Sequence, residues 1–112
     1  MVNNNYVPEK GDLVWLDFNP QAGHEQRGRR PAIVISQNIY NQKTNLALFC
    51  PITSHVKGYP FEVELDNQSI KGVVLSDQIK NLDWTKRNCE FIENAKNETT
   101  EKVVENIKLI IE

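Results

Sequence analysis

The stretch Gly11 to Phe18, which reads GDLVWLDF, predicts a β-strand and indicates the fold class of the chain. It is short, apolar and aromatic, which is typical of a strand that packs in a core. A turn-forming segment, Glu9 to Asp12, begins it, and Asn19-Pro20 ends it. We therefore expect it to be the first strand of a sheet.

Four further segments have the composition of strands. Pro31 to Ser36 (PAIVIS) and Leu46 to Ile52 (LALFCPI) are continuous apolar runs, as expected of buried strands. Phe61 to Leu65 (FEVEL) alternates between apolar and polar residues, and Gly72 to Leu75 (GVVL) resumes the sheet. The segments between strands are expected to be loops, connections or turns, and they are Gln21 to Arg29, Tyr40 to Asn45 and Asp66 to Gln68.

One helix is predicted, at the end of the chain after Thr99-Thr100-Glu101. Its apolar residues recur at helical spacing, and they are Val103, Val104, Ile107, Ile110 and Ile111. We expect this stripe to face the sheet. Because no helix is expected between the strands, parallel βαβ units are excluded. The predicted fold class is mainly β: a compact, strongly bent antiparallel sheet or small barrel with a C-terminal α-helix.

Length and composition indicate one domain. The chain has 112 residues, 39% of them hydrophobic, so residues 1–112 are expected to form a single packed unit. Met1 to Asp12 is polar and no apolar span follows, so we expect neither a signal peptide nor a membrane segment, and a cytoplasmic protein. Cys50 and Cys89 form no Cys-x-x-Cys pair, which predicts buried thiols rather than a disulfide framework or a zinc site.

Charge is distributed unevenly, although the net charge is only −2. Residues 21–60 contain five basic residues and one acidic residue, a local balance of +4. Residues 90–112 contain six acids and three lysines, a local balance of −3. The first segment therefore predicts a surface for phosphate, whereas the second is expected to face solvent, away from that surface.

The densest cluster of reactive side chains lies between the first two predicted strands. From His24 to Arg30 the chain places an imidazole, a carboxylate and three guanidiniums within seven positions. A planar guanidinium matches two phosphate oxygens, and Glu25 or His24 can take a proton, so the cluster suits phosphodiester chemistry. Pro31 keeps Arg30 out of the helical region at the loop-to-strand junction. The alternative is a solvated loop with surface ion pairs.

Five short motifs follow one another along the chain. They are Gly11-Asp12-Leu13-Val14-Trp15, Gly23-His24-Glu25-Gln26 with Arg30-Pro31, Pro51-Ile52-Thr53-Ser54, Lys57-Gly58-Tyr59-Pro60-Phe61 and Ser76-Asp77-Gln78. In this order and spacing they resemble the MazF/PemK family of toxin endoribonucleases of type II toxin–antitoxin systems. The resemblance covers nearly the whole chain, whereas any one motif alone is unspecific.

The resemblance implies a homodimer of SH3-like barrels that cleaves single-stranded RNA, including mRNA, within a short recognition sequence and so inhibits translation and growth. It implies attack by the 2′-hydroxyl without a metal or other cofactor, giving 2′,3′-cyclic phosphate and 5′-hydroxyl ends, so DNA is expected to bind uncut. It also implies an antitoxin whose acidic disordered tail fills the RNA groove over the basic segment 21–60. Neither a membrane nor double-stranded DNA is an expected direct partner.

The resemblance also implies catalytic roles for individual residues. Glu25 is implied as the base, Arg30 as the acid or charge stabiliser, and Thr53 as a support for the phosphate. A guanidinium with a pKa above about 12 is a poor acid, so we expect Arg30 to stabilise charge. His24 is the alternative base, because an imidazole titrates near neutral pH. The choice between Glu25 and His24 stays open.

Further residues are interpreted as binding or structural. Leu75 replaces the arginine that some relatives place two residues before the aspartate, which favours a structural or base-reading role for Asp77. His55 is interpreted as an exposed loop residue, and Trp15 and Trp84 as core or dimer interface. The expected RNA-binding residues are Arg27, Arg29, Lys57, Asp77 and Gln78.

Two alternative functions remain open. The resembling superfamily also contains toxins that poison DNA gyrase without cutting RNA, but those lack the glutamate, arginine and threonine set. A plain RNA-binding barrel would use its arginines for affinity alone. The recognised RNA sequence is set by groove shape and loop backbone, which composition and motifs do not reveal.

Overall fold

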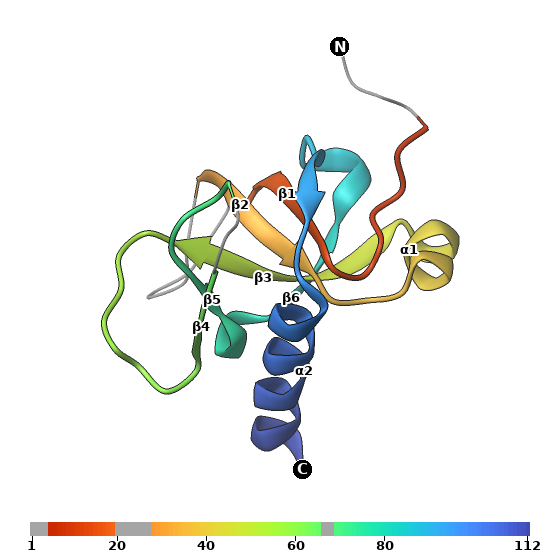
Figure 1. The fold of residues 1–112 in the computed structure, drawn as a ribbon. Helices are drawn as coiled ribbons and strands as arrows, with labels where there is room; N and C mark the ends of the chain where they lie inside the picture. The colour runs from red at the N-terminus through yellow and green to blue at the C-terminus, as the bar shows by residue number, and fades with distance from the viewer. Residues whose placement is uncertain (1–4, 20–27, 66–68) are drawn as a thin grey trace.

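The computed structural model describes residues 5–19, 28–65 and 69–112 and arranges them as one bent sheet with a C-terminal helix (Figure 1). The strands are β1 (Asp12–Asp17), β2 (Arg29–Val34), β3 (Leu46–Thr53), β4 (Glu62–Glu64), β5 (Val73–Leu75), β6 (Lys80–Asp83) and β7 (Glu90–Asn94). The helices are α1 (Asn38–Thr44) and α2 (Asn97–Ile111), and the 3₁₀ turns are η1 (Ser76–Gln78) and η2 (Trp84–Lys86).

The strands pair antiparallel in the order β4-β5-β3-β2-β1-β7, with β6 beside β3. Strand β3 bends the sheet, because its first half pairs with β6 while its last two residues pair with β5. Within the described ranges the outermost strands β4 and β7 do not pair, so the sheet is strongly bent but not closed. The predicted bent antiparallel sheet with a C-terminal helix is confirmed.

The first three strands have buried residues on both faces, which explains why their sequences are apolar runs, although Trp15 in β1 is 37% exposed. Successive side chains of a strand point to opposite faces, so Leu13 and Cys50 join one core cluster while Val14 and Phe49 join the other. The first cluster also contains Val103 of α2. Helix α2 therefore covers one face of the sheet.

Both cysteines are free thiols, but only one is fully buried. Cys50 has no exposed surface, as predicted, and burial raises the pKa of its thiol to about 12. Cys89 is half-buried, so the prediction of a buried thiol is only partly right there, although burial again raises the pKa to about 12.

Three elements were not expected from the sequence. Helix α1 forms where a connection over Tyr40 to Asn45 was predicted, because its stabilising contacts come from outside the segment. The buried Asn41 donates to the carbonyls of Pro8 and Ser36 and accepts from the Ser36 hydroxyl. Strands β6 and β7 lack an apolar run and are specified by pairing with β3 and β1. The start of the acidic segment 90–112 is thus part of the sheet. Its acids nevertheless face solvent as predicted, because five of the six are exposed, namely Glu90, Glu98, Glu101, Glu105 and Glu112.

Helix α2 follows the predicted stripe for only part of its length. Val103 is fully buried and Ile107 packs against the first core cluster, whereas Leu109, Ile110 and Ile111 at the helix end are mostly exposed. The end of the helix projects beyond the sheet (Figure 1). In the described part of the chain, no helix has the length and apolarity needed to cross a membrane.

Candidate functional site

Two adjoining pockets lie where β2 begins and β3 ends. The arginine pocket, about 500 Å³, is lined by Arg29, Arg30, Pro31, Ile52, Thr53, Ser54, His55 and Lys71. The aspartate pocket, about 300 Å³, is lined by Thr53, His55, Lys57, Tyr59, Glu62, Leu75, Asp77 and Gln78. Because Thr53 and His55 line both pockets, the two form one groove. The charged side chains at one end of the groove are all cations, whereas the other end combines Lys57 with the carboxylates of Glu62 and Asp77.

Strand pairing brings Arg30 and Thr53 to the same edge of the groove. Ala32 pairs with Pro51 between β2 and β3, and this register continued outward puts Arg30 level with Thr53. Partial burial lowers the pKa of the Arg30 guanidinium below its usual value, but a guanidinium still carries its charge at neutral pH. Arg30 therefore presents a desolvated positive charge beside a hydroxyl.

Thr53 is held by its neighbours on both sides. Its Oγ1 accepts a hydrogen bond from the backbone N–H of His55 at 3.1 Å, which leaves the hydroxyl hydrogen to be donated elsewhere. Gly72 has a φ of +124°, and a Cβ at that position would collide with the Thr53 carbonyl. Only glycine lets the backbone before β5 approach this closely, and the approach places Lys71 beside Thr53.

The loop that follows β3 is organised by the carboxylate of Glu62. It accepts hydrogen bonds from the backbone N–H groups of Lys57, Gly58 and Tyr59 at 3.0, 3.1 and 3.3 Å. The Tyr59 hydroxyl in turn donates to Asp77 in η1, and this hydrogen bond raises the pKa of Tyr59. The loop and η1 are therefore tied together across the aspartate pocket.

The groove collects several residues that the sequence singled out as functional. Arg30, Thr53, Lys57, Asp77 and Gln78 all line it. His24, Glu25 and Arg27 lie outside the described residues. His55, Lys71 and Tyr59 also line the groove, and His55 is an exposed loop residue, as interpreted from the sequence. Their place follows from the pairing of β3 with β5, which no local pattern in the sequence reveals.

Arg29 sits differently from its neighbour, although its side chain also borders the arginine pocket. Its guanidinium contacts Asp17 at 3.2 Å and Glu90 at 2.5 Å, and donates to the Asn88 carbonyl at 2.8 Å. Asn88 also donates to Asp17 at 2.8 Å. Arg29 thus joins β2 to β1 and β7.

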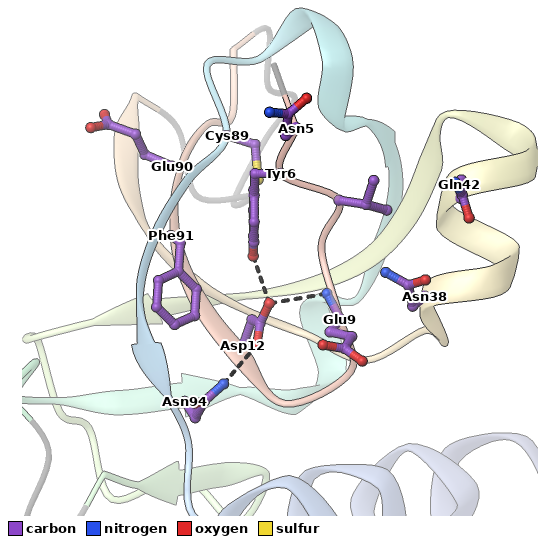
Figure 2. A pocket seen from close by; sticks show the side chains of 11 residues that line it. Asn5, Tyr6, Glu9, Asp12, Asn38, Gln42, Cys89, Glu90, Phe91 and Asn94 are labelled. Carbon is purple, nitrogen blue, oxygen red and sulfur yellow. Dashed lines mark hydrogen bonds between the residues drawn. The ribbon is translucent and has the colours of Figure 1, made fainter. Parts of the chain in front are cut away.

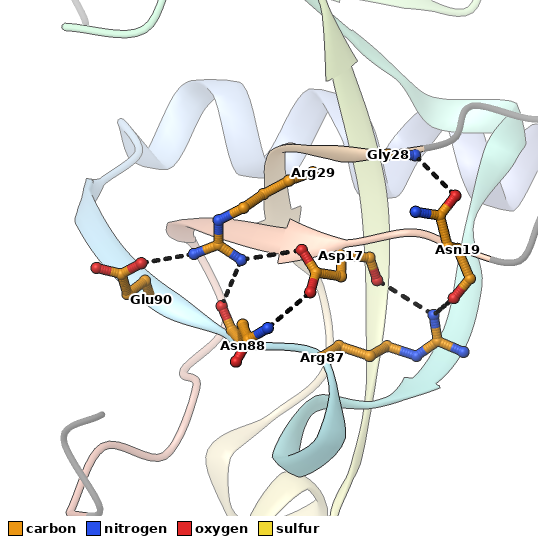
Figure 3. Close-up of polar contacts among 7 residues, drawn as sticks. All are labelled: Asp17, Asn19, Gly28, Arg29, Arg87, Asn88 and Glu90. Atoms are coloured by element: carbon orange, nitrogen blue, oxygen red, sulfur yellow. Dashed lines mark hydrogen bonds and ion pairs between the residues drawn. The ribbon is translucent and has the colours of Figure 1, made fainter. Parts of the chain in front are cut away.

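The described residues that flank segment 20–27, Asn19 and Gly28, are hydrogen-bonded beside β2 (Figure 3). The N–H of Phe18 donates to the Gly28 carbonyl at 2.9 Å, and the N–H of Gly28 donates to the Asn19 side chain at 3.2 Å. Arg87 donates to the carbonyls of Asp17 and Asn19 at 3.1 and 2.8 Å. These bonds fix where the segment that carries His24, Glu25 and Arg27 leaves and rejoins the sheet.

A larger pocket of about 680 Å³ lies between the N-terminal segment, α1 and β7 (Figure 2). We call it the acidic pocket, because its charged lining residues are Glu9, Asp12 and Glu90. Asp12 accepts from the Tyr6 hydroxyl at 2.6 Å, from the backbone N–H of Glu9 at 3.0 Å and from Asn94 at 2.9 Å. A surface of this charge repels phosphate, so we assign the functional site to the groove instead.

Metal chemistry has no evident site in the part of the chain that is described. No group of three or more His, Cys, Asp or Glu side chains there could hold a metal ion. The groove instead offers a guanidinium, an ammonium and a hydroxyl, which are hydrogen-bond donors suited to an oxyanion.

Comparisons with known families, sequences and solved structures agree with one another. The family described as PemK-like, MazF-like toxin of type II toxin-antitoxin system matches residues 9–111. The endoribonuclease toxin MazF of Escherichia coli (strain K12) is 51% identical over 84 residues, which cover 75% of this chain and 76% of that protein. The crystal structure of MazF (Form-I) from Deinococcus radiodurans has a TM-score of 0.93 and 47% identity, over 96% of this chain and 98% of that chain.

A complex gives a further match. The crystal structure of MazE-MazF (Form-II) from Deinococcus radiodurans has a TM-score of 0.84 and 41% identity, over 96% of this chain and 97% of that chain. In both structural comparisons, the backbones therefore agree over at least 96% of each chain. The chain belongs to the PemK-like, MazF-like family of toxins of type II toxin–antitoxin systems.

Proposed function

We propose that this chain is the toxin of a type II toxin–antitoxin system and that it acts as an endoribonuclease on single-stranded RNA in the cytoplasm. The observation that carries the proposal is the groove in which Arg30 and Thr53 lie level with each other beside Lys71. The E. coli relative that is 51% identical is itself an endoribonuclease toxin. Residues 1–112 act as one domain in this proposal.

The proposed reaction uses the RNA's own 2′-hydroxyl and no metal. Its oxygen forms a bond to the adjacent phosphorus, the bond from phosphorus to the 5′-oxygen breaks, and the products are a 2′,3′-cyclic phosphate and a 5′-hydroxyl. Glu25 or His24 takes the proton of the attacking hydroxyl. The leaving 5′-oxygen takes up a proton from water, and the protonated base returns its own proton to the solvent. DNA lacks the attacking group and is therefore bound but not cut.

Arg30 and Thr53 stabilise the reacting phosphate. The phosphate gains negative charge in the transition state, and a desolvated guanidinium attracts this charge more strongly than one in water. The Thr53 hydroxyl donates to a phosphate oxygen while its own oxygen stays bonded to the His55 N–H. Lys57 and Lys71 attract neighbouring phosphates of the strand.

The proposed partners are a second copy of the chain and an antitoxin. The solved MazE-MazF complexes of Deinococcus radiodurans support an antitoxin partner, because a MazF chain in them is 41% identical to this one. An acidic disordered tail complements the cations of the groove, namely Arg30, Lys57 and Lys71. Such a tail blocks RNA by occupying the same surface.

The test is sequencing of 5′-hydroxyl ends made from a long RNA by the purified chain in the presence of a chelator. We expect cuts within one short sequence by the wild type, and loss of cuts in whichever of Glu25→Gln and His24→Gln removes the base. RNA that stays intact with the wild type would overturn the proposal. Binding without cutting would instead indicate the plain RNA-binding barrel.

A further inference from the structure

We propose that the imidazole of His55 is a further catalytic group, which donates the proton that the leaving 5′-oxygen takes up. The proposal rests on the proposed function, because it supplies the acid of that same cleavage. His55 is one of two histidines in the chain, and the other, His24, is a candidate base. The reaction needs a proton donor as well as an acceptor, since one bond to phosphorus forms while another breaks.

His55 lies where the two pockets of the groove meet. It lines both of them, whereas Arg30 lines only the arginine pocket of the two and Asp77 only the aspartate pocket. The backbone N–H of His55 donates to Thr53 Oγ1 at 3.1 Å, which fixes residue 55 beside the hydroxyl that contacts the reacting phosphate. The residue is exposed, so a substrate can reach its ring. An imidazole at this junction therefore borders a phosphate that Arg30 and Thr53 bind.

The positions of base and acid fit an in-line displacement. The attacking and leaving oxygens stand on opposite sides of the phosphorus, so the groups that remove and supply a proton stand on opposite sides too. Segment 20–27, which carries both candidate bases, rejoins the sheet at Gly28, next to Arg29, and of the two pockets Arg29 lines only the arginine pocket. His55 lies where that pocket opens into the aspartate pocket. The leaving nucleotide, on the side away from the base, therefore passes His55.

The other side chains of the groove are poorer proton donors. A guanidinium and a lysine ammonium, with ordinary pKa values of about 12.5 or more and about 10.4, hold their protons too tightly at neutral pH. The Tyr59 hydroxyl donates to Asp77, and this hydrogen bond raises the pKa of Tyr59. Ionised carboxylates accept hydrogen bonds and donate none. An imidazole ordinarily titrates at about pH 6.5, so it both carries a proton and releases it near neutral pH.

The step balances without a further reactant. As the 2′-oxygen bonds to phosphorus, the bond from phosphorus to the 5′-oxygen breaks, and its electron pair stays on that oxygen. The oxygen takes the proton of a ring N–H of His55, which changes from imidazolium to imidazole. The ring then regains a proton from water. The proton thus reaches the leaving oxygen from water by way of His55, while the base returns its own proton to the solvent.

The test replaces the bridging 5′-oxygen by sulfur in a short RNA that contains the sequence cut by the wild type. A thiol has an ordinary pKa of about 8.5, so a thiolate leaves without a proton, whereas an alkoxide needs one. Single-turnover cleavage of the oxygen and the sulfur RNA by the full chain is measured. His55→Gln keeps a side-chain N–H donor but has no acidic proton. We expect it to cleave the oxygen RNA about 10²-fold more slowly than the wild type, and the sulfur RNA as fast.

Two further variants separate proton donation from other roles. Arg30→Ala is the matched control, because it removes charge stabilisation of the phosphate and is expected to slow the cleavage of both RNAs alike. Affinity for an RNA made uncleavable by a 2′-deoxy sugar is expected to change little in His55→Gln, since the imidazole acts on the leaving oxygen. Equal losses on both RNAs in His55→Gln, or no loss on either, overturn the proposal. Restoration of His24→Gln by sulfur, without restoration of His55→Gln, also overturns it and assigns the acid to His24.

The outcomes distinguish this proposal from the proposed function. A wild type that cleaves the oxygen RNA, with equal losses on both RNAs in His55→Gln, overturns this proposal and leaves the nuclease standing. A wild type that cleaves neither RNA overturns both.

Discussion

The groove and the acidic pocket belong to the same sheet but use their charged side chains in different ways. In the acidic pocket Asp12 is 4% exposed, and both of its carboxylate oxygens accept hydrogen bonds from the chain itself. In the groove Arg30 and Lys71 line open space at the edge of the sheet. A charge whose partners come from the fold stabilises the fold, whereas a charge that lines an open pocket can bind a ligand.

The consecutive residues Arg29 and Arg30 show the same difference in how a charged side chain is used. Successive residues of a strand point to opposite faces, so one guanidinium reaches the carboxylates of β1 and β7 while the other borders Thr53. The sequence places both in one basic cluster. Because β2 begins at Arg29, both arginines belong to the strand, and their side chains therefore point in opposite directions.

The largest expected effect comes from Arg30→Ala. Removing one preorganised charge at a developing oxyanion typically costs about 10²–10³-fold in rate. We expect a loss of that size in the cleavage of a short labelled RNA, because the guanidinium of Arg29, which borders the same pocket, is already paired with Asp17 and Glu90. The thermal unfolding temperature is expected to change little.

Arg29→Ala is the matched control for Arg30→Ala. It removes the ion pair with Glu90, in which the Arg29 side chain is 35% exposed and the Glu90 side chain is 71% exposed. Pairs at such exposed positions contribute at most about 1 kcal/mol to the free energy of unfolding. Chemical denaturation should detect this small loss, while cleavage stays near that of the wild type. Equal losses of cleavage in both variants would erase the distinction between the two arginines.

Gly72→Ala tests how closely β5 approaches the site. A Cβ at this position collides with the Thr53 carbonyl, and φ is +124°, so we expect the free energy of unfolding to fall by about 2–3 kcal/mol. Urea denaturation measures the change. Gly58→Ala is the control, because its φ of +78° has open space around the Cβ and the strain alone costs about 1–2 kcal/mol. Similar costs at both glycines would contradict the close approach at Gly72.

Asp12→Asn tests the acidic pocket as a structural element. The Asp12 carboxylate uses both of its oxygens to accept hydrogen bonds from Tyr6, Glu9 and Asn94, whereas an amide has only one accepting oxygen. At least one of these donors therefore loses its partner. We expect the free energy of unfolding to fall by about 2 kcal/mol, with cleavage per folded molecule unchanged. Denaturation and initial rates measured on one preparation check both parts. A stable but inactive variant would move this pocket into the functional site.

The smallest expected effect is that of Lys71→Gln on RNA affinity. Loss of one phosphate contact lowers the slope of log affinity against log salt by about 0.7 for a single strand. Lys43→Gln removes the same charge from an exposed position on α1 and is expected to leave the slope unchanged. A salt titration by fluorescence anisotropy compares the two. Equal slopes for Lys71→Gln and the wild type would exclude Lys71 from the phosphate path.

Much of the sheet was predictable because its information is local. The apolar runs of β1, β2 and β3 report burial on two faces, and the stripe around Val103 reports a helix with one buried side. Strands β6 and β7 were missed because their side chains carry no such run, and α1 was missed because the contacts of Asn41 come from Pro8, 33 residues away. Elements whose stability depends on distant partners leave little trace in a local pattern.

The sequence by itself determined the family, through the order of five motifs, and it identified Arg30, Thr53, Lys57, Asp77 and Gln78 as candidates by their side-chain chemistry. Only the tertiary structure decided that these residues share one groove, that Lys71 and His55 join them, and that Arg29 instead spans β1 and β7. The reason is physical. Chemical type belongs to each residue, whereas proximity is created by strand pairing between segments that lie far apart in the chain.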